Sequence, residues 1–293
     1  MVAAITSLTD CAPRFGDENM ITRRLRQPGG PPLEFIEAQP KGEPVGAPVL
    51  FLHGAFCGAW SWSEIFLPFF ARRGRHVGAL SLRGHNAGGN LYRLSTATLS
   101  DYLADARRAF GEFSEPPVVI GHSLGGLLAQ MLIGRVEMRA LILLASLPPE
   151  GLFFESPRLI VTDPHIWLEA VTAAAGLTRQ PMALAAAELL FSEGLPREHV
   201  RRYAAMMTPE APRALFEAHF PGPVLSALFF GVPTLVVGGT RDRLISQAST
   251  WRTAVYHGAQ HEIADGQGHF PMLDPGAETV ARNIIDWLER RSV

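Results

Sequence analysis

The motif Gly-His-Ser-Leu-Gly-Gly at residues 121–126 restricts the fold of this chain more than any other feature. An apolar, β-branched run at 117–120 precedes it, and a second apolar segment at 127–133 follows it. This context predicts a buried strand that turns sharply into a helix, with Ser123 at the turn. The glycines suit a turn so tight that Cβ atoms would collide with the neighbouring strands. Such a turn presents the serine hydroxyl as a nucleophile.

A second apolar strand pattern, at residues 48–52, runs into a glycine-containing loop that begins at His53. Acyl transfer by a serine requires hydrogen-bond donors for the negative charge that develops on the carbonyl oxygen. The usual donors are one backbone N–H from such a loop and the N–H of the residue after the serine. We therefore assign this role to the N–H groups of Ala55 and Leu124. His53 itself is expected to be a structural hydrogen-bonding residue.

Two later segments each place one titratable residue just past a strand. Asp242 follows the apolar strand pattern 233–237, and His269 lies in the segment Gly-Gln-Gly-His-Phe-Pro that begins at residue 266. The chain order Ser123, Asp242, His269 is that of an α/β-hydrolase triad and differs from the orders of the two large serine-protease folds. Asp274 is the alternative acid, but its short turn suits it better to begin the final helix.

On these motifs the chain resembles the α/β-hydrolase fold superfamily, in its serine esterase and lipase-like branch, from about Ile21 to the C-terminus. The resemblance implies an α/β fold with a mostly parallel central sheet, helices on both faces and a helical cap inserted after the sixth strand. The segment Leu-Ser-Leu-Arg-Gly-His at 80–85 is similar to the turn after the family's fourth strand. This similarity implies that Arg83 and His85 support neighbouring loops.

The loop His-Gly-Ala-Phe-Cys-Gly-Ala-Trp at 53–60 is similar to that of the plant methylesterase and hydroxynitrile lyase group. Those lyases carry a threonine after the strand histidine and a lysine after the catalytic histidine, where this chain has Gly54 and Phe270. A lyase reaction is therefore disfavoured, because no ammonium group stands beside His269. Haloalkane dehalogenases and epoxide hydrolases of this fold carry an aspartate in place of Ser123, which argues against both.

The resemblance implies a serine hydrolase that cleaves a carboxylic ester of a small or medium apolar substrate through an acyl-enzyme. We expect Phe56, His122 and Phe270 to contact that substrate. Several reactions on the same triad stay open: thioester hydrolysis, lactone hydrolysis, peroxide-dependent acyl transfer and carbon–carbon cleavage. A ligand receptor with weak hydrolysis is a further alternative.

The alternation of strands and helices stops between Leu147 and Gly231, where the sequence becomes alanine-rich and helical. We interpret 147–231 as the cap, 19–146 and 232–293 as the core, and 1–18 as a flexible leader. Aromatic residues in the cap favour an apolar pocket. The cap helices are predicted at 165–175, 181–191, 197–207 and 211–220.

The core segments read as alternating strands and helices, which predicts a parallel sheet with the site at the carboxyl ends of its strands. Besides the strands named above, we predict strands near 21–26, 33–38, 76–82, 140–145 and 261–264. The predicted core helices lie near 63–72, with a kink at Pro68, and near 99–113, 247–256 and 277–290.

The composition is that of one globular domain, with 293 residues, 47% hydrophobic content and a net charge of −2. This charge gives no general attraction to nucleic acid or to an anionic membrane. No run of eighteen uncharged apolar residues predicts a membrane span. The first residues lack the basic start and apolar core of a signal peptide, so we expect a cytoplasmic protein. The oligomeric state stays open.

Neither a disulfide, a metal site nor a bound cofactor is expected. Cys11 and Cys57 fall in the leader and in the loop after the strand, and we interpret Cys57 as a buried packing residue. His257 and His261 are four residues apart, but a strand at the second would separate them too far to share an ion. The sequence contains no phosphate-binding loop and no strand-linked dinucleotide fingerprint.

Overall fold

The computed structural model describes residues 20–26, 32–86, 94–175, 177 and 184–293. The predicted leader and Cys11 lie outside these residues. Within the described residues, no helix is both long and apolar enough to cross a membrane.

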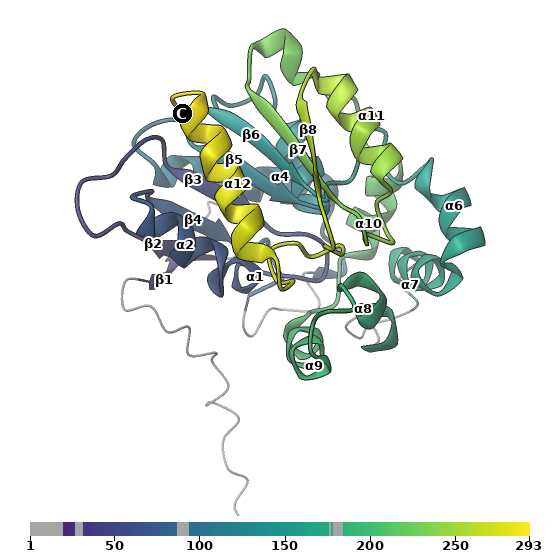
Figure 1. Ribbon diagram of the computed structural model, residues 1–293. Helices are drawn as coiled ribbons and strands as arrows, with labels where there is room; N and C mark the ends of the chain where they lie inside the picture. Colours follow the sequence, from purple (N-terminus) through teal and green to yellow (C-terminus); the bar gives the residue numbers. More distant parts are fainter. Residues whose placement is uncertain (1–19, 27–31, 87–93, 176, 178–183) are drawn as a thin grey trace, which may run out of the picture.

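A single eight-stranded sheet forms the centre of the molecule, with the strand order β1-β2-β4-β3-β5-β6-β7-β8 (Figure 1). β1 pairs with β2 and β2 with β4 in antiparallel fashion, and the other neighbours are parallel. The predicted strands are all present. Their bounds are β1 Met20–Leu25, β2 Leu33–Ala38, β3 Val49–Leu52, β4 Val77–Leu80, β5 Val118–His122, β6 Ala140–Leu144, β7 Thr234–Gly239 and β8 Gln260–Ala264.

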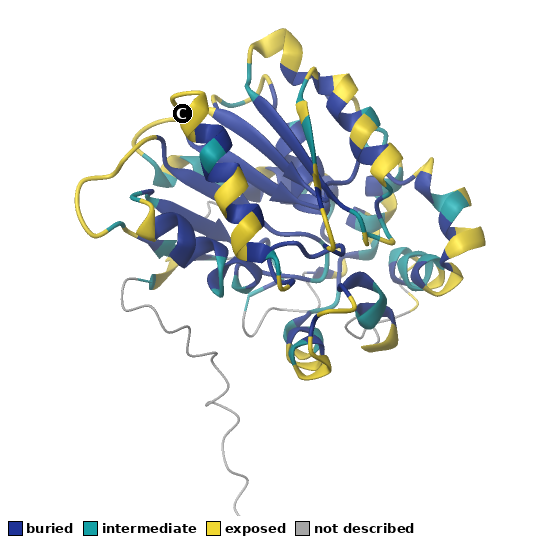
Figure 2. Ribbon diagram, in the orientation of Figure 1, coloured by how far each residue is buried: buried dark blue, intermediate teal, exposed yellow. Residues whose placement is uncertain are grey.

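Helices cover both faces of this sheet, as predicted (Figure 1). Successive residues of a strand point to opposite faces, so in β3 Val49 and Phe51 pack into one apolar core while Leu50 and Leu52 pack into the other. This explains why the central strands are continuously apolar and buried (Figure 2). The core helices are α1 Trp60–Ser63, α2 Phe66–Arg72, α4 Leu99–Ala109, α5 Leu124–Met131, α11 Gln247–His257 and α12 Ala277–Arg290.

One core helix differs from its prediction. The helix predicted near 63–72 begins later, as α2 at Phe66, and a separate short helix, α1, precedes it, with Glu64 and Ile65 between the two. Pro68 is the third residue of α2. A proline costs little there, because the N–H groups of a helix's first turn have no partner within the helix.

The helices between β6 and β7, in the segment that we predict to form a cap, lie mainly at the end of the sheet where the parallel strands finish (Figure 1). The helices of this cap segment are α6 Glu155–Thr162, α7 Pro164–Ala174, α8 Leu184–Leu190, α9 Arg197–Met206 and α10 Pro212–His219. The 3₁₀ helix η2 Ala227–Phe230 follows them and leads into the start of β7. Four of the cap-segment helices, α7 to α10, correspond to the predicted cap helices. The sequence did not predict α6, because the β-branched residues Ile160, Val161 and Thr162 disfavour a helix there.

Candidate active site

Ser123 forms the turn between β5 and α5 in a strained backbone conformation, with φ 49° and ψ −118°. A residue with a Cβ atom rarely adopts a positive φ. The surrounding main chain holds the strain in place. The Ser123 N–H donates to the Leu144 carbonyl (3.2 Å), and the Ser123 carbonyl accepts from the Leu147 N–H (3.1 Å). The end of β6 therefore fixes the turn at which the serine stands.

The glycines of this turn are required because it packs directly against β3. A Cβ atom on Gly125 would lie 2.3 Å from the Leu52 carbonyl oxygen, and one on Gly121 would lie 2.6 Å from the Gly125 carbonyl oxygen. Both distances are shorter than any ordinary contact. The predicted collision with a neighbouring strand is confirmed for Gly125, whereas a Cβ atom on Gly121 would collide with the start of α5.

The structure brings Ser123, Asp242 and His269 together from three separate loops. His269 Nε2 lies 3.0 Å from Ser123 Oγ, and His269 Nδ1 lies 3.0 Å from Asp242 Oδ2. The other Asp242 oxygen accepts the N–H groups of Leu244 and Ile245, each at 2.9 Å. The Asp242 side chain is fully buried. A carboxylate that accepts from Nδ1–H leaves Nε2 free to accept a proton from the serine hydroxyl.

Asp274 is not placed to act on His269. Its Oδ2 accepts the N–H of Gly268 (2.6 Å) and its Oδ1 accepts the N–H of Ser192 (3.1 Å). The expectation that Asp274 caps the final helix was wrong, because the residue before α12 is Gly276, with no side-chain cap. Asp274 instead ties the loop that carries His269 to the cap. Burial raises the pKa of Asp274, while the two N–H donors favour the carboxylate.

The two predicted oxyanion donors stand close to the serine. Ala55 lies in the turn after β3, and Leu124 is the first residue of α5. Among the described residues, neither backbone N–H has a hydrogen-bond acceptor. A Cβ atom on Gly54 would lie 2.9 Å from the Ser123 Cβ, so this turn packs directly against the serine. The role of these two N–H groups as oxyanion donors stays a prediction.

His122 lies next to His269, the histidine of the proposed triad, with ring centroids 4.9 Å apart. Its buried Nε2–H donates to the His269 carbonyl (2.7 Å), and its Nδ1 has no partner among the described residues. Burial lowers the pKa of His122 well below its usual range, and the neighbouring His269 lowers it further. His122 is therefore neutral. Its expected contact with substrate stays a prediction.

An aromatic stack runs from the core across the cap to the residue after His269. The Trp60 and Tyr203 rings are 6.2 Å apart, Tyr203 and Phe191 are 5.7 Å apart, and Phe191 and Phe270 are 4.8 Å apart. All three pairs are nearly parallel. Phe270, predicted to contact substrate, is itself buried in this stack. The stack ends beside the histidine, since the Phe270 and His269 rings are 5.5 Å apart.

His53 supports the turn that carries Ala55, as expected. Its Nδ1–H donates to the Gly54 carbonyl (2.8 Å), and its Nε2 accepts the N–H of Leu82 (3.0 Å). Burial lowers the pKa of His53 to about 3. The neutral ring is required, because Nε2 must accept from a backbone donor.

Arg83 and His85 also hold neighbouring segments, in agreement with the sequence analysis. Arg83 Nε donates to Asp105 (2.9 Å), which lies on α4. His85 Nδ1 lies 2.8 Å from Thr208 Oγ1, and His85 Nε2 lies 3.0 Å from Glu210 Oε1. Glu210 is a buried carboxylate between α9 and α10 that sequence reasoning missed. No pattern around it distinguishes it from a surface residue.

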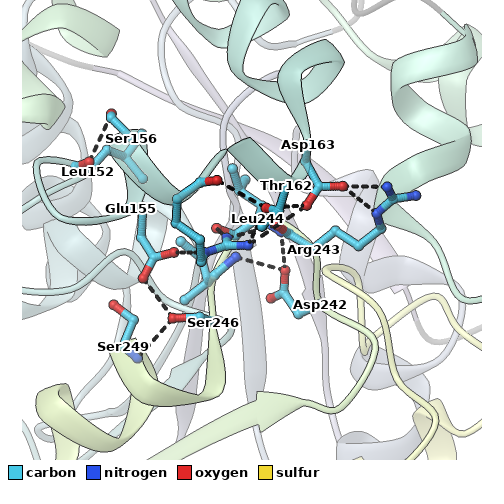
Figure 3. A network of polar contacts seen from close by, with 12 residues as sticks. Leu152, Glu155, Ser156, Thr162, Asp163, Asp242, Arg243, Leu244, Ser246 and Ser249 are labelled. Carbon is cyan, nitrogen blue, oxygen red and sulfur yellow. Dashed lines mark hydrogen bonds and ion pairs between the residues drawn. The ribbon is translucent and has the colours of Figure 1, made fainter. Parts of the chain in front are cut away.

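The cap also holds the loop that carries Asp242 (Figure 3). Arg158 of α6 donates to the carbonyls of Arg243 (2.8 Å) and Leu244 (2.7 Å). Glu155 accepts from the Ser246 hydroxyl (2.8 Å) in the same loop. The unpredicted helix α6 therefore positions the loop from which Asp242 reaches His269.

Three further residues named from the sequence, Cys57, His257 and His261, lie in structural surroundings. Cys57 is buried, and burial raises the pKa of its thiol. His257 accepts the Ala227 N–H at Nδ1 (3.1 Å) and donates from Nε2 to Gln130 (3.0 Å). His261 lies on β8 beside Thr250.

Comparisons with known proteins agree with this architecture. The chain matches the profile of the alpha/beta hydrolase family over residues 49–282. A protein of Mycobacterium phage D29, which carries the provisional name of a non-heme haloperoxidase, is 27% identical over 267 residues, covering 85% of this chain and 91% of that protein.

Solved structures show the same fold. The carboxylesterase CesB of Bacillus subtilis is similar with a TM-score of 0.68 at 18% identity, covering 94% of this chain and 93% of that one. A thermophilic esterase of Thermogutta terrifontis is similar with a TM-score of 0.67 at 19% identity, covering 94% and 99%. On the match to the family profile, this chain belongs to the alpha/beta hydrolase family.

Proposed function

We propose that this hydrolase cleaves carboxylic esters of small or medium, apolar substrates through an acyl-enzyme on Ser123. The observation that carries the proposal is the relay of two contacts, each of 3.0 Å, from Ser123 Oγ through the His269 ring to Asp242. Such a relay activates a serine hydroxyl, because the histidine takes its proton while the buried carboxylate stabilises the imidazolium.

In the acylation step, Ser123 Oγ attacks the ester carbonyl carbon as His269 Nε2 removes the hydroxyl proton. The carbonyl oxygen becomes an oxyanion and accepts the N–H groups of Ala55 and Leu124. Asp242 remains the hydrogen-bond acceptor of His269 Nδ1–H throughout, because its second oxygen is held by two backbone donors. The tetrahedral intermediate then expels the alcohol, which receives its proton from His269.

In the deacylation step, a water molecule attacks the acyl-enzyme while His269 acts again as the base. A second oxyanion forms at the same two donors. Its collapse releases the carboxylic acid and returns the proton to Ser123 Oγ.

The apolar character of the substrate is supported by the aromatic stack beside His269. Phe270 and Phe191 lie parallel there, and the neutral His122 ring lies 5.1 Å from Phe270. A charged acyl group would lose its hydration against such a wall without a partner. We propose that Phe56, His122 and Phe270 shape the acyl site and that residues 147–231 form the cap above it.

The test is hydrolysis of a p-nitrophenyl ester series from acetate to palmitate by the wild-type protein and by Ser123→Ala. We expect an optimum at short or medium chains, and a loss of at least about 10³-fold in kcat for the variant. Ser156→Ala, on α6, is the matched control and keeps the wild-type rate. A folded Ser123→Ala protein with undiminished turnover contradicts the proposal. A lactone, a thioester, a carbon–carbon substrate and peroxide-dependent acyl transfer are assayed in parallel.

A further inference from the structure

We propose that Glu210 is a positioning residue that holds the turn at residues 54–57 in the conformation needed by the oxyanion donor Ala55. The inference rests on the proposed function, because it concerns how one of the two oxyanion donors is kept in place. Glu210 lies in the cap, between α9 and α10, and reaches into the core.

The turn is strained at Phe56. The Cys57 N–H donates to the Gly54 carbonyl (3.3 Å), which closes a four-residue turn with Ala55 and Phe56 in the middle. Phe56 has φ 64°, while Ala55 does not have a positive φ. This is the pattern of a type II turn, in which the third position favours glycine. With phenylalanine there, rotation of the Ala55–Phe56 peptide to a type I turn would relieve the strain.

Glu210 opposes that rotation by accepting the N–H of the peptide that would rotate, and Thr208 holds the next peptide at the Phe56 carbonyl. The Phe56 N–H donates to Glu210 Oε2 (2.9 Å), and the Phe56 carbonyl accepts the Thr208 N–H (2.9 Å). Rotating the peptide would turn the N–H away from the carboxylate. A buried carboxylate oxygen would then lose its donor, which is costly.

The carboxylate itself is held rigidly on its other oxygen. Glu210 Oε1 accepts from the Tyr102 hydroxyl (2.5 Å), the Ala211 N–H (2.7 Å) and His85 Nε2 (3.0 Å). The Glu210 and His85 side chains are fully buried. Burial alone would raise the pKa of Glu210, but the His85 charge and these donors lower it to about 2. Glu210 is therefore an anion at any pH used for assay.

Glu210 affects the proposed oxyanion donor because the two peptides concerned are neighbours in the chain. The proposed donor N–H of Ala55 belongs to the peptide directly before the one that Glu210 fixes. The carbonyl of that donor peptide, on Gly54, is held from the other side by His53 Nδ1–H (2.8 Å). Oxyanion donors act over a narrow distance range of about 2.7–3.1 Å, so a small displacement of Ala55 weakens catalysis.

The variant that tests this is Glu210→Gln, which keeps the shape of the side chain. A glutamine amide has one acceptor oxygen and one NH₂ group. In either orientation, the NH₂ group therefore faces a hydrogen-bond donor that the carboxylate oxygen of Glu210 accepts from in the wild type. Glu217→Gln is the matched control. Glu217 is also a cap carboxylate that accepts a core backbone N–H, from Leu99 (2.8 Å), but it does not contact the turn.

Two readouts separate positioning from a merely structural role. The first is kcat and KM for the best p-nitrophenyl ester. The second is the Ki of a trifluoromethyl ketone with the same acyl chain, whose adduct with the serine carries an oxyanion. We expect Glu210→Gln to lower kcat by about 10- to 100-fold with KM within about threefold, and to raise the ketone Ki by a similar factor. Glu217→Gln changes neither.

A rescue experiment tests the strain directly. Glycine adopts φ 64° without cost, so Phe56→Gly removes the strain that Glu210 restrains. In a double-mutant cycle, Glu210→Gln should lower kcat less in the Phe56→Gly background than in the wild type. Equal losses in both backgrounds contradict the role assigned to Glu210.

Tyr102→Phe decides the question if Glu210→Gln does not fold. It removes one donor from Oε1 and leaves the carboxylate, so we expect kcat and ketone affinity to fall together by a few-fold. The inference is overturned if kcat and the ketone Ki both keep their wild-type values, in Tyr102→Phe or in a folded Glu210→Gln protein. It is also overturned if kcat falls while the ketone Ki stays unchanged. Undiminished turnover by Ser123→Ala overturns the proposed function instead, so the two failures are distinguishable.

Discussion

The carbonyl of Leu190, the last residue of α8, accepts a hydrogen bond of 2.7 Å from the backbone N–H of His269. The cap therefore holds the main chain of the histidine that we propose as the base. It does so at the backbone, where a substitution of the Leu190 side chain does not remove the contact.

The same relationship recurs at the other loops of the site. Glu210 binds the turn that carries Ala55, and Arg158 binds the loop that carries Asp242. The cap thus contacts three of the segments from which the site is assembled. We infer that the cap is part of the frame of the site as well as a wall for the substrate.

Arg158→Met tests this frame at the acid loop. The variant removes the hydrogen bonds to the Arg243 and Leu244 carbonyls and keeps an unbranched side chain. We expect the free energy of unfolding to fall by about 1–3 kcal/mol, because these bonds involve a charged donor. We expect kcat for the best ester to fall by about 10-fold as Asp242 becomes less well placed. The measurements are urea denaturation and steady-state kinetics.

The control for that variant is Arg197→Met. Arg197 pairs with Glu188 at the protein surface, where an ion pair contributes little. Its stability and kcat should match the wild type within error. Equal effects of the two substitutions would show that the position of Arg158 has no special importance.

The assignment of the acid is tested by comparing Asp242→Asn with Asp274→Asn. Asparagine at 242 no longer holds the His269 tautomer that leaves Nε2 as the acceptor, so kcat should fall by about 10⁴-fold with little change in stability. Asparagine at 274 replaces one of the two oxygens that accept buried backbone N–H groups with an NH₂ donor, so its main effect should be on stability, about 1–3 kcal/mol. The reverse pattern would assign the acid to Asp274.

Much of the fold could be predicted from the sequence because its signals are local. The run 117–120 is apolar on both faces, as a central parallel strand must be, and the elbow glycines have a steric reason within a few residues. The order Ser123, Asp242, His269 was likewise visible, because each residue follows its own strand pattern.

The contacts that join the cap to the site could not be predicted, because they connect residues far apart in the chain. Glu210 is separated from Phe56 by 154 residues, and nothing in its neighbours signals burial. Helix α6 has three successive β-branched residues, so local propensity opposes a helix whose tertiary contacts at Arg158 favour it. Asp274 was misassigned to a helix cap for the same reason, since its donors come from two other segments.

The close approach of the elbow to β3 makes Gly125→Ala a sharp test of the packing. The added methyl group would lie 2.3 Å from the Leu52 carbonyl oxygen and 2.5 Å from the His53 carbonyl oxygen, and backbone atoms cannot move away cheaply. We expect a loss of about 1–3 kcal/mol or more in the free energy of unfolding, and a lower kcat because Leu124 moves with the turn. Gly222→Ala is the control, since no atom lies within 4 Å of its Cβ position. Equal thermal stability of the two variants would contradict the predicted packing.

Two buried histidines predict that the protein loses stability in mild acid. His53 accepts the Leu82 N–H and His257 accepts the Ala227 N–H, so neither ring nitrogen involved can bind a proton in the folded state. Burial lowers the pKa of His53 to about 3 and that of His257 to about 4.

An unfolded histidine has a pKa of about 6.5, so between pH 6.5 and 4 the unfolded chain binds protons that the folded chain does not. The free energy of unfolding should therefore fall as the pH is lowered through this window, by up to about 1.4 kcal/mol per pH unit for each histidine. Above pH 7.5 both histidines are neutral in both states, so they add no slope.

Urea denaturation at pH 7.5, 6.0 and 5.0 measures how the free energy of unfolding changes with pH. The variant His257→Gln lacks one of the two titrating groups. The slope of its unfolding free energy against pH should therefore be smaller by the contribution of one histidine, whatever the variant's overall stability. The carboxylate of Glu210 does not obscure this result, because its lowered pKa makes its own contribution disappear only below about pH 4.5. A wild-type stability that stays constant from pH 7.5 to 5.0 would mean that the two rings can take up protons without losing their backbone donors.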